Sequence, residues 1–345
     1  MRAIYFTEFN GKLEVKDLPD PIASDRGVVI KVEASGLCRS DWHGYVGHDT
    51  DIKLPHVPGH ELAGTIASIG SAVKKFKVGD RVTVPFVNGC GDCEFCLRGD
   101  AQVCPKQTQP GFTHWGSFAE LVALENADFN LINLPDEISF STAAALGCRF
   151  ATAFRGLAKR AQVKPGEWVS VFGCGGVGLS AIMIAKALGA KVIAVDISER
   201  ALEQAGKLGA DLLINSKDVD AIASIQTMCG GADVAIDALG SPETTQAAVM
   251  SLKRRGRHLQ LGLLLTPTGL TQMPMARVIA WELDLLGSHG MAAVDYPEML
   301  ELVKSGALAP EKLRTNEIGL AIGTKALAEM DLYNTPGITI INPQH

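Results

Sequence analysis

A glycine-rich turn between an apolar segment and a helical segment constrains this chain more than any other feature. Residues 171–179 read Val-Phe-Gly-Cys-Gly-Gly-Val-Gly-Leu, which contains the pattern G-x-G-x-x-G. Gly173 permits a tight turn, Gly175 lets the backbone approach a pyrophosphate, and Gly178 lets the helix pack closely on the strand. The helix start, at Gly176 and Val177, then points free N–H groups at phosphates. The pattern predicts a dinucleotide-binding loop; an ordinary glycine turn is the alternative.

An acidic residue, Asp196, ends the next predicted strand after this loop. A carboxylate at this place accepts hydrogen bonds from the ribose hydroxyls of adenosine and repels a 2′-phosphate. The sequence therefore favours NAD as the cofactor, although the nearby Arg200 keeps NADP as an alternative. We interpret Cys174, inside the loop, as a small filler and not as a reactive thiol.

From about residue 166, short apolar segments alternate with longer segments of helical spacing. We expect strands at 167–172, 191–196, 212–215, 233–237, 257–262 and 284–287, and helices at 177–188, 199–208, 219–228 and 242–252. Parallel strands need crossovers, and both faces of their sheet must be covered. The alternation therefore predicts an α/β fold with a Rossmann-type doubly wound parallel sheet.

The first half of the chain has short alternating runs, such as residues 28–32 and 81–84, which turn residues separate. This pattern of short alternating runs and turns predicts a β-rich domain. The tail after about residue 288 is too short for a domain and is expected to return to the N-terminal half. We thus expect a discontinuous catalytic domain of residues 1–149 and 287–345 and a dinucleotide-binding domain of residues 150–286, as the length of 345 residues allows.

Charge and hydropathy exclude several classes of partner. The formal net charge is −6, and we expect no basic face of the size that a nucleic acid or a membrane surface requires. The N-terminus lacks a signal-peptide pattern, and the apolar segments are too short to span a membrane. We therefore expect a cytoplasmic protein with a small-molecule partner. Its eight cysteines are then not expected to form disulfides, so metal ligation, catalysis or packing must explain them.

Four cysteines close together in sequence predict a structural zinc site. Cys90, Cys93, Cys96 and Cys104 follow spacings of x2, x2 and x7. Two-residue spacers let successive thiolates converge on one ion, and four sulfurs complete a tetrahedral shell with no open position. An iron–sulfur cluster uses the same ligands and is the alternative, but a dinucleotide-binding domain in the same chain favours zinc.

A second group of candidate ligands is dispersed along the chain, at Cys38, His60 and Cys148. Two thiolates and one histidine would leave a fourth zinc position open for a substrate oxygen, as catalysis requires. Taken singly, each cysteine is more often a buried small hydrophobic residue, and the histidine is more often part of a core or a loop.

These motifs together resemble the zinc-containing alcohol dehydrogenases of the medium-chain dehydrogenase/reductase superfamily, over nearly the whole chain. Gly59-His60-Glu61 resembles the family's zinc signature, the four cysteines resemble its structural zinc lobe, and residues 38–43 (Cys-Arg-Ser-Asp-Trp-His) resemble its catalytic loop. The resemblance implies a GroES-like fold for the β-rich domain, two zinc ions per chain, NAD as cofactor, and a homodimer or homotetramer.

The resemblance also implies roles for single residues. Cys38, His60 and Cys148 would ligate the catalytic zinc, as in the Cys₂His site for which alcohol dehydrogenase is the standard example. Asp41 would orient His60, and Glu61 would lie behind the metal. Cysteine as the third ligand favours the simple-alcohol branch, because polyol-type relatives often place a carboxylate there.

Further roles concern proton transfer and binding. By the same resemblance Ser40 would take the alcohol proton and His43 would pass it to solvent through the cofactor ribose; the alternatives are a turn hydroxyl and a surface histidine. Arg39 would contact the cofactor pyrophosphate, and Phe86 would form an apolar wall of the substrate pocket. His48 and Asp49 could border this pocket. The other histidines are interpreted as structural or exposed: His56, His114, His258, His289 and His345.

One departure and two alternatives accompany this interpretation. Many relatives have an arginine after the glycine that opens the last strand, where this chain has Gly337-Ile338, so one phosphate anchor is expected to be missing. The predicted activity is reversible hydride transfer between a primary or secondary alcohol and NAD. A polyol or amino-alcohol dehydrogenase of the same superfamily is the first alternative, and a catalytically idle cofactor-binding protein is the second.

Overall fold

The computed structural model describes residues 1–265, 270–332 and 337–345, and the chain forms two compact units. Unit 1 comprises Met1–Ala151, Gly290–Lys304 and Arg314–His345, and unit 2 comprises Thr152–His289 and Ser305–Leu313. The expected domain boundaries, after residues 149 and 286, lie close to the first two junctions. Residues 305–313, which the sequence predicts to belong to the catalytic domain, lie in unit 2.

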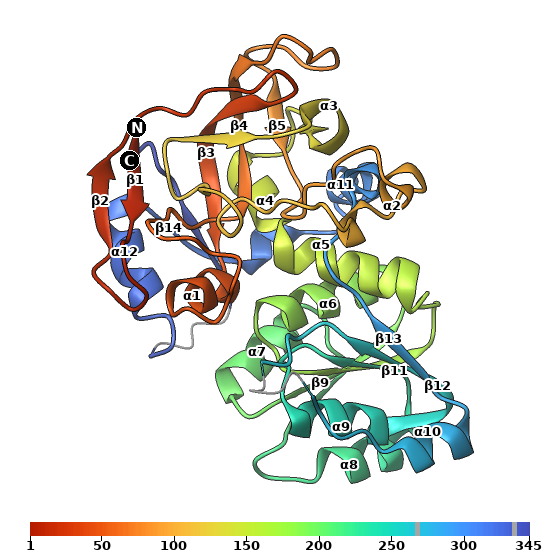
Figure 1. The fold of residues 1–345 in the computed structure, drawn as a ribbon. Coiled ribbons are helices and arrows are strands. Elements are labelled where there is room, and N and C mark those ends of the chain that lie inside the picture. Colours follow the sequence, from red (N-terminus) through yellow and green to blue (C-terminus); the bar gives the residue numbers. More distant parts are fainter. Residues whose placement is uncertain (266–269, 333–336) are drawn as a thin grey trace. The chain divides into compact units, whose positions relative to one another are not determined.

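A six-stranded parallel sheet forms the centre of unit 2 (Figure 1). Its strand order is β10-β9-β8-β11-β12-β13, and every neighbouring pair is parallel. In order of sequence this is 3-2-1-4-5-6, the order of a dinucleotide-binding doubly wound sheet, which confirms the predicted fold class. The strands are β8 (Trp168–Phe172), β9 (Lys191–Asp196), β10 (Leu212–Asn215), β11 (Ala232–Asp237), β12 (Leu252–Gln260) and β13 (Asp284–Gly287).

Helices connect these strands, as the alternation of periods predicts. They are α6 (Gly176–Ala187), α7 (Glu199–Lys207), α8 (Ala221–Cys229), α9 (Pro242–Ser251) and α10 (Met275–Trp281). The π-helix η2 (Gly156–Arg160) and the 3₁₀ helix η4 (Pro310–Leu313) also belong to unit 2, and α5 (Cys148–Arg155) crosses from unit 1 into unit 2. Ser198, Asp220 and Ser241 cap α7, α8 and α9 with side-chain oxygens, which satisfies N–H groups that each helix start leaves without an intrahelical partner.

Several elements of unit 2 differ from the predictions: α5, η2 and η4 are not predicted, and β12 and α10 differ as well. β12 begins at Leu252 and not at residue 257. Its first half is irregular: Arg255 takes a positive φ of 62°, and the pairing with β11 shifts register between Ala232 and Val234. An irregular segment of this kind has no period of two that a sequence pattern could reveal. Helix α10 is not predicted at all, since its seven residues are too few to display a helical period.

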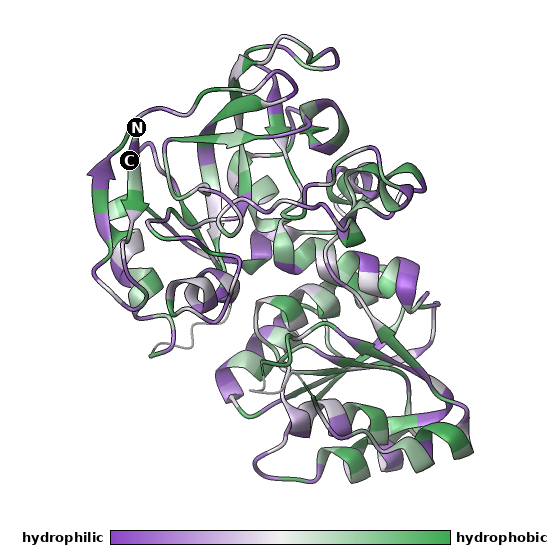
Figure 2. Ribbon diagram, viewed as in Figure 1, coloured by the Kyte–Doolittle hydropathy of each residue, from purple (hydrophilic) through white to green (hydrophobic). Residues whose placement is uncertain are grey.

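Unit 1 is built on a seven-stranded sheet of order β14-β15-β3-β4-β5-β7, in which β6 also pairs with β3. Its strands are β3 (Val28–Leu37), β4 (Glu61–Ile69), β5 (Arg81–Thr83), β6 (Leu121–Leu124), β7 (Ile132–Asn133), β14 (Arg314–Ile318) and β15 (Ile338–Ile341), and a separate pair joins β1 (Arg2–Tyr5) to β2 (Glu14–Asp17). Alternate residues of β3, namely Val28, Ile30 and Val32, enter a core with Leu62 and Ile66 of β4. Figure 2 colours the hydrophobic stretches of these strands green.

Short helices complete unit 1: α1 (Arg39–Tyr45), α2 (Glu94–Leu97), α3 (Ala127–Asn130), α4 (Phe140–Ala145), α11 (Tyr296–Lys304) and α12 (Leu320–Ala328), with the 3₁₀ turns η1 (Ala101–Val103) and η3 (Ala293–Asp295). The tail of the chain packs on the N-terminal half, because β15 pairs antiparallel with β3 and places Thr339 opposite Leu37. Leu320 and Leu327 of α12 share a core with Ile4. No helix in the described part of the chain is both long and apolar enough to cross a membrane.

Candidate active site

The pairing of β3 with β4 brings the first two predicted zinc ligands together. β3 ends at Leu37, directly before Cys38, and β4 begins at Glu61, directly after His60. In the antiparallel register Gly36 lies opposite Glu61, so the residues that follow β3 and precede β4 leave the sheet side by side. One strand pairing thus brings together Cys38 and His60, which are far apart in the sequence.

Cys148, the first residue of α5, joins them. One ligand atom each from Cys38, His60, Glu61 and Cys148 lies within 4.8 Å of all the others, and all but Cys148 are buried. The three dispersed residues that the sequence singled out therefore meet in one cluster in unit 1, and Glu61 is a fourth candidate ligand.

The histidine of this cluster presents a free nitrogen. His60 Nδ1 lies 2.7 Å from Asp41 Oδ1, and because an ionised carboxylate only accepts, Nδ1 is the donor. Nε2 is left with its lone pair; it is buried and has no hydrogen-bond partner among the described residues. The backbone N–H groups of Cys38 and Gly59 also donate to Asp41, over 2.9 and 3.2 Å. A buried, partnerless lone pair beside two thiols fits a zinc ion, which accepts nitrogen and sulfur ligands.

Glu61 is already engaged by a cation. Both of its carboxylate oxygens accept from the Arg149 side chain, at Oε1 over 3.2 Å and at Oε2 in a closer bond, and Oε1 also accepts from the Arg149 backbone N–H over 3.1 Å. Glu61 is fully buried and the Arg149 side chain is 8% exposed. A Cβ on Gly36 would lie 2.3 Å from Glu61 Oε2, and one on Gly147 would lie 2.6 Å from Glu61 Cβ, so both positions must be glycine. Held in this way, Glu61 is less available as a ligand than the other three residues.

The ionisation of the two thiols is linked by their contact. A hydrogen bond from Cys148 lowers the pKa of Cys38 well below its ordinary value, and the positive Arg149 lowers it further. The same bond raises the pKa of Cys148, and burial adds to this effect. Burial also raises the pKa of Glu61 against the opposing effect of Arg149. The cluster thus favours a thiolate at Cys38, and thiolate is the form of cysteine that binds metal.

The predicted relay residues lie on α1, which Cys38 caps. The Asp41 carboxylate accepts from the Cys38 N–H in a capping box, so one side chain both starts the helix and orients His60. Ser40 Oγ lies 3.8 Å from Cys38 Sγ. Ser40 and His43 are three positions apart on α1 and therefore share one helix face. Burial, His48 and Arg39 lower the pKa of His43 to about 4.

Arg39, the predicted pyrophosphate contact, has partners within unit 1. Its guanidinium lies 2.5 Å from Asp331 Oδ1 and 3.3 Å from the Met330 carbonyl, and it stacks over the Trp42 ring at 4.8 Å. This ion pair is half-exposed, and exposed pairs contribute little free energy, about 0–1 kcal/mol. An exchange of Asp331 for a phosphate is therefore energetically accessible, and the role of Arg39 toward a cofactor stays a prediction.

The four-cysteine cluster forms a separate site in unit 1. Its sulfurs all lie within 4.8 Å of one another; Cys90 and Cys96 are 3.9 Å apart, and Cys93 and Cys104 are 3.7 Å apart. The edge of a tetrahedron of sulfurs around zinc, with bonds of about 2.3 Å, is about 3.8 Å, whereas a disulfide needs about 2.05 Å. The arrangement therefore fits a tetrahedral metal shell.

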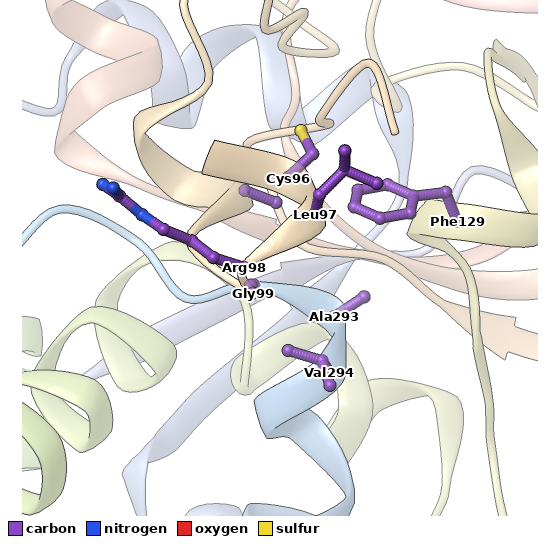
Figure 3. Close-up of a pocket in the computed structure, with 9 residues that line it drawn as sticks. Cys96, Leu97, Arg98, Gly99, Phe129, Ala293 and Val294 are labelled. Carbon is purple, nitrogen blue, oxygen red and sulfur yellow. The ribbon is translucent and has the colours of Figure 1, made fainter. Parts of the chain in front are cut away.

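A pocket of about 350 Å³ lies beside this cluster (Figure 3). It is lined by Cys96 to Gly99 on one side and by Ala292 to Val294, from the C-terminal part of unit 1, on the other. Its walls are apolar apart from Arg98, which pairs with Asp100 over 2.9 Å. No set of polar groups converges in it, so we interpret it as a packing gap where the returning tail covers the cysteine lobe, and not as the substrate site.

The glycine loop is formed in unit 2, between β8 and α6. Gly173 has a φ of +92°, which a residue with a side chain rarely adopts. A Cβ on Gly178 would lie 1.8 Å from the Gly173 carbonyl oxygen, whereas a Cβ on Gly175 would meet nothing within 4 Å. The first and third glycines are thus required by the turn and by packing, and the second faces open space. Gly175 also caps α6 without a side-chain bond, so the N–H groups of the helix start, from Gly176 and Val177 on, are left for a ligand.

Asp196 ends β9 next to this loop. Its Oδ2 accepts from the Cys174 N–H over 2.6 Å, and its Oδ1 accepts from the Ser198 N–H over 2.9 Å. These bonds fix the carboxylate and leave lone pairs for ribose hydroxyls. Cys174 is fully buried and burial raises its pKa above the usual range, which agrees with a filler and not with a reactive thiol.

Phe86, the predicted pocket wall, contacts the His60 ring edge-on at 5.9 Å. Three further residues near the cluster were not predicted from the sequence: Phe112, Tyr296 and Arg149. Phe112 contacts the His60 ring at 5.1 Å from another loop. Burial raises the pKa of Tyr296, and Cys148 and Glu61 raise it further, so this tail residue also lies near the cluster. Arg149 adjoins a predicted ligand, but only its buried pairing with Glu61 shows its importance. Phe112 and Tyr296 carried no signal in the sequence.

The last strand opens with Ile338, at the position where the family resemblance implies an arginine. Ile338 begins β15 and is fully buried among the residues of unit 1. The expected loss of this cofactor contact therefore stays a prediction.

Comparison with known proteins agrees with this geometry. A model of the alcohol dehydrogenase GroES-like domain matches residues 24–136, and a model of the zinc-binding dehydrogenase domain matches residues 176–305. An alcohol dehydrogenase of Geobacillus stearothermophilus is 34% identical over 308 residues, which cover 89% of this chain and 90% of that protein.

Two further similarities bear on the substrate. A sorbitol dehydrogenase of Bacillus subtilis is also 34% identical, over 90% of this chain and 88% of its own. A solved structure of an NAD-dependent alcohol dehydrogenase superposes with a TM-score of 0.88 at 30% identity and covers 99% of both chains. Overall identity therefore does not separate simple-alcohol from polyol relatives.

Proposed function

The chain belongs to the zinc-containing alcohol dehydrogenases of the medium-chain dehydrogenase/reductase superfamily, and from this premise we propose that it catalyses reversible hydride transfer between a primary or secondary alcohol and NAD. The observation that carries this proposal is the cluster of Cys38, His60 and Cys148. Two thiols and one buried imidazole lone pair supply three ligands, while Glu61 is held by Arg149. A fourth position is then open for a substrate oxygen.

Zinc bound here would polarise the substrate oxygen and lower the pKa of an alcohol toward neutrality. The chain's own residues supply the other functions. Asp41 fixes the tautomer and direction of His60. Ser40 would accept the alcohol proton, and His43, three positions further along the same helix, would pass it on to solvent. Phe86 and Phe112 exclude water around His60, which suits an apolar substrate.

We propose two zinc ions per chain and NAD as cofactor. The sulfur separations of 3.7 and 3.9 Å support a structural ion at Cys90, Cys93, Cys96 and Cys104. Four thiolates leave no open position, so this ion would take no part in the chemistry. The fixed carboxylate of Asp196 supports NAD over NADP, because it would repel a 2′-phosphate.

Polyol oxidation is the second candidate, since the Bacillus subtilis sorbitol dehydrogenase is as similar as the alcohol dehydrogenase. Against it stand the apolar rings beside His60 and the cysteine at position 148. A polyol would need hydroxyl partners at this place to replace its hydrogen bonds with water.

A substrate panel tests these proposals. Primary, secondary and aromatic alcohols, sorbitol and an amino alcohol would be offered with NAD and with NADP, with NADH absorbance as the readout and metal analysis on the same sample. We expect turnover of simple alcohols with NAD and two zinc ions per chain. Higher kcat/KM for sorbitol would establish the polyol alternative, and NADH binding without turnover of any alcohol or aldehyde would establish the catalytically idle one.

We also propose that the protein is a cytoplasmic homodimer or homotetramer. Six of the eight cysteines belong to the two candidate metal clusters, and cysteines that ligate metal are typical of a reducing compartment. β13 is an edge strand of the unit 2 sheet, and Leu285 on it and Ile279 on α10 are 40% and 75% exposed. Light scattering during size-exclusion chromatography would measure the mass; a monomer would contradict the oligomeric proposal.

A further inference from the structure

A second histidine contacts the predicted relay residue at the end of α1. His48 Nδ1 lies 2.9 Å from His43 Nδ1, so one ring donates a hydrogen bond and the other accepts it. His43 is half-buried, whereas His48 is exposed. A half-buried imidazole is thus joined by a short bond to one that faces water.

The backbone holds this pair in place. The His48 N–H donates to the His43 carbonyl over 2.9 Å, and the Gly47 N–H donates to the Gly44 carbonyl over 3.1 Å. Together with the left-handed φ of +84° at Gly47, these bonds form a Schellman motif, which reverses the chain at the end of a helix. The Trp42 ring packs edge-on against both imidazoles, at 5.0 and 5.9 Å. The contact between the histidines is therefore built into the helix end.

The surroundings of His43 disfavour the protonated form of its ring. Burial is the main factor that disfavours a positive charge on His43; His48 and Arg39 add to its effect, while Cys38 and Asp331 oppose it. His43 has its pKa lowered to about 4, so its ring is neutral near pH 7 and releases readily any proton that it receives. His48 offers an acceptor at hydrogen-bond distance.

We propose that His48 is the outlet of the proton relay: it takes the proton that His43 receives and passes it to bulk water. This inference rests on the proposed dehydrogenase function. During alcohol oxidation a proton reaches His43 Nε2, the Nδ1 proton of His43 moves to Nδ1 of His48, and His48 loses its Nε2 proton to water or buffer. Each ring gains one proton and loses one, so no charge accumulates. His48 is a positioning residue for proton transfer, because it acts only through His43.

The test compares His48→Gln with the wild type in the zinc-loaded, full-length enzyme, during oxidation of the best alcohol of the panel. NADH absorbance and a pH indicator would follow hydride transfer and proton release in stopped flow at low buffer concentration. Glutamine keeps polar contacts but cannot relay a proton. We expect proton release and oxidation to slow on the order of 10-fold, less than the 10²–10⁴-fold typical of a direct acid or base. Added imidazole should restore both rates.

Two further variants sharpen the test. The double variant His43→Gln with His48→Gln should be no slower than His43→Gln alone. The effects of two residues on the rate are not additive when both residues act in the same proton relay. The matched control is His345→Gln, an exposed histidine at the C-terminus, which should keep wild-type rates. If His48→Gln does not fold, as judged by circular dichroism and zinc content, His48→Asn takes its place.

Three outcomes would overturn the proposal: wild-type rates for His48→Gln at low buffer, a loss that imidazole does not restore, or losses that multiply in the double variant. The second outcome would mean that His48 only holds the His43 ring in place and carries no proton. Failure of the dehydrogenase function itself is distinguishable, because the wild type would then form no NADH.

Discussion

The two candidate metal sites of this protein take their cysteine ligands from the chain in opposite ways. The lobe at Cys90 to Cys104 takes its ligands from one short stretch of chain, and two of its thiols are only partly buried. The cluster at Cys38, His60 and Cys148 takes its ligands from the end of one strand, the start of another and the start of a helix, and it lies deep in unit 1.

This difference reflects what each ion would do. A structural ion needs four thiolates and little else, so a local loop is sufficient. A reactive ion needs an open position, an oriented histidine and a controlled charge, and these need partners from several elements. Asp41, Arg149 and the two glycines that make room for Glu61 are such partners, and within the described residues the four-cysteine lobe has no equivalent buried ion pair.

The largest expected effect separates the two sites by activity. Cys38→Ser should lower kcat by about 10³-fold or more, because loss of a metal ligand removes several kcal/mol of transition-state stabilisation. NADH binding, measured by fluorescence titration, should largely survive. The matched control is Cys229→Ser, whose Sγ donates to the Ile225 carbonyl, a bond that a hydroxyl can also make. Normal rates for Cys38→Ser would remove this residue from the metal site.

A large loss of stability is expected when the ion pair beside the cluster of Cys38, His60 and Cys148 is broken. Arg149→Met would leave the Glu61 carboxylate buried without its cation, which costs about 3–5 kcal/mol. The free energy of unfolding, from denaturant titration, should fall by this amount. The double variant Glu61→Gln with Arg149→Met should recover part of it, since no charge is then buried. If Arg149→Met has the same free energy of unfolding as the wild type, the ion pair between Arg149 and Glu61 does not stabilise the fold.

The four-cysteine lobe should respond in stability before activity. Cys93→Ser should lower Tm by on the order of 10 °C, because structural zinc ligation contributes directly to folding. One zinc ion per chain should be lost, as measured by metal analysis, while freshly prepared enzyme keeps most of its kcat. An unchanged Tm would count against a structural ion, and a loss of kcat as large as that of Cys38→Ser would erase the distinction between the sites.

The smallest expected effect concerns the carboxylate behind His60. Asp41→Asn should weaken zinc binding at the reactive site by about 10–100-fold, the usual cost of losing such a partner, with no change at the cysteine lobe. Competition with a chelator, followed by metal analysis, would measure both. Asp92→Asn is the matched control, because Asp92 accepts from Cys90 over 2.8 Å at an exposed position. Equal zinc loss in both variants would contradict a specific role of Asp41.

The sequence by itself determined the parts that depend on local spacing. The glycine loop with Asp196, the alternation of strands and helices in unit 2 and the four-cysteine lobe are all readable from residues close together in the chain. The physical reason is that turn geometry, strand and helix periods and the reach of a two-residue spacer are local properties. The irregular start of β12 and the short α10 were missed because they have no regular period.

Only the tertiary structure decided the parts that depend on distant residues. The sequence spacing of Cys38, His60 and Cys148 does not show that they lie close together. The strand register that sets Gly36 opposite Glu61 brings Cys38 next to His60, and helix α5 adds Cys148. The pairing of Arg149 with Glu61, 88 positions apart, is likewise not predictable from sequence, since neither residue type identifies its partner. Long-range packing sets which side chains share a buried site, and burial in turn sets their charge and their chemistry.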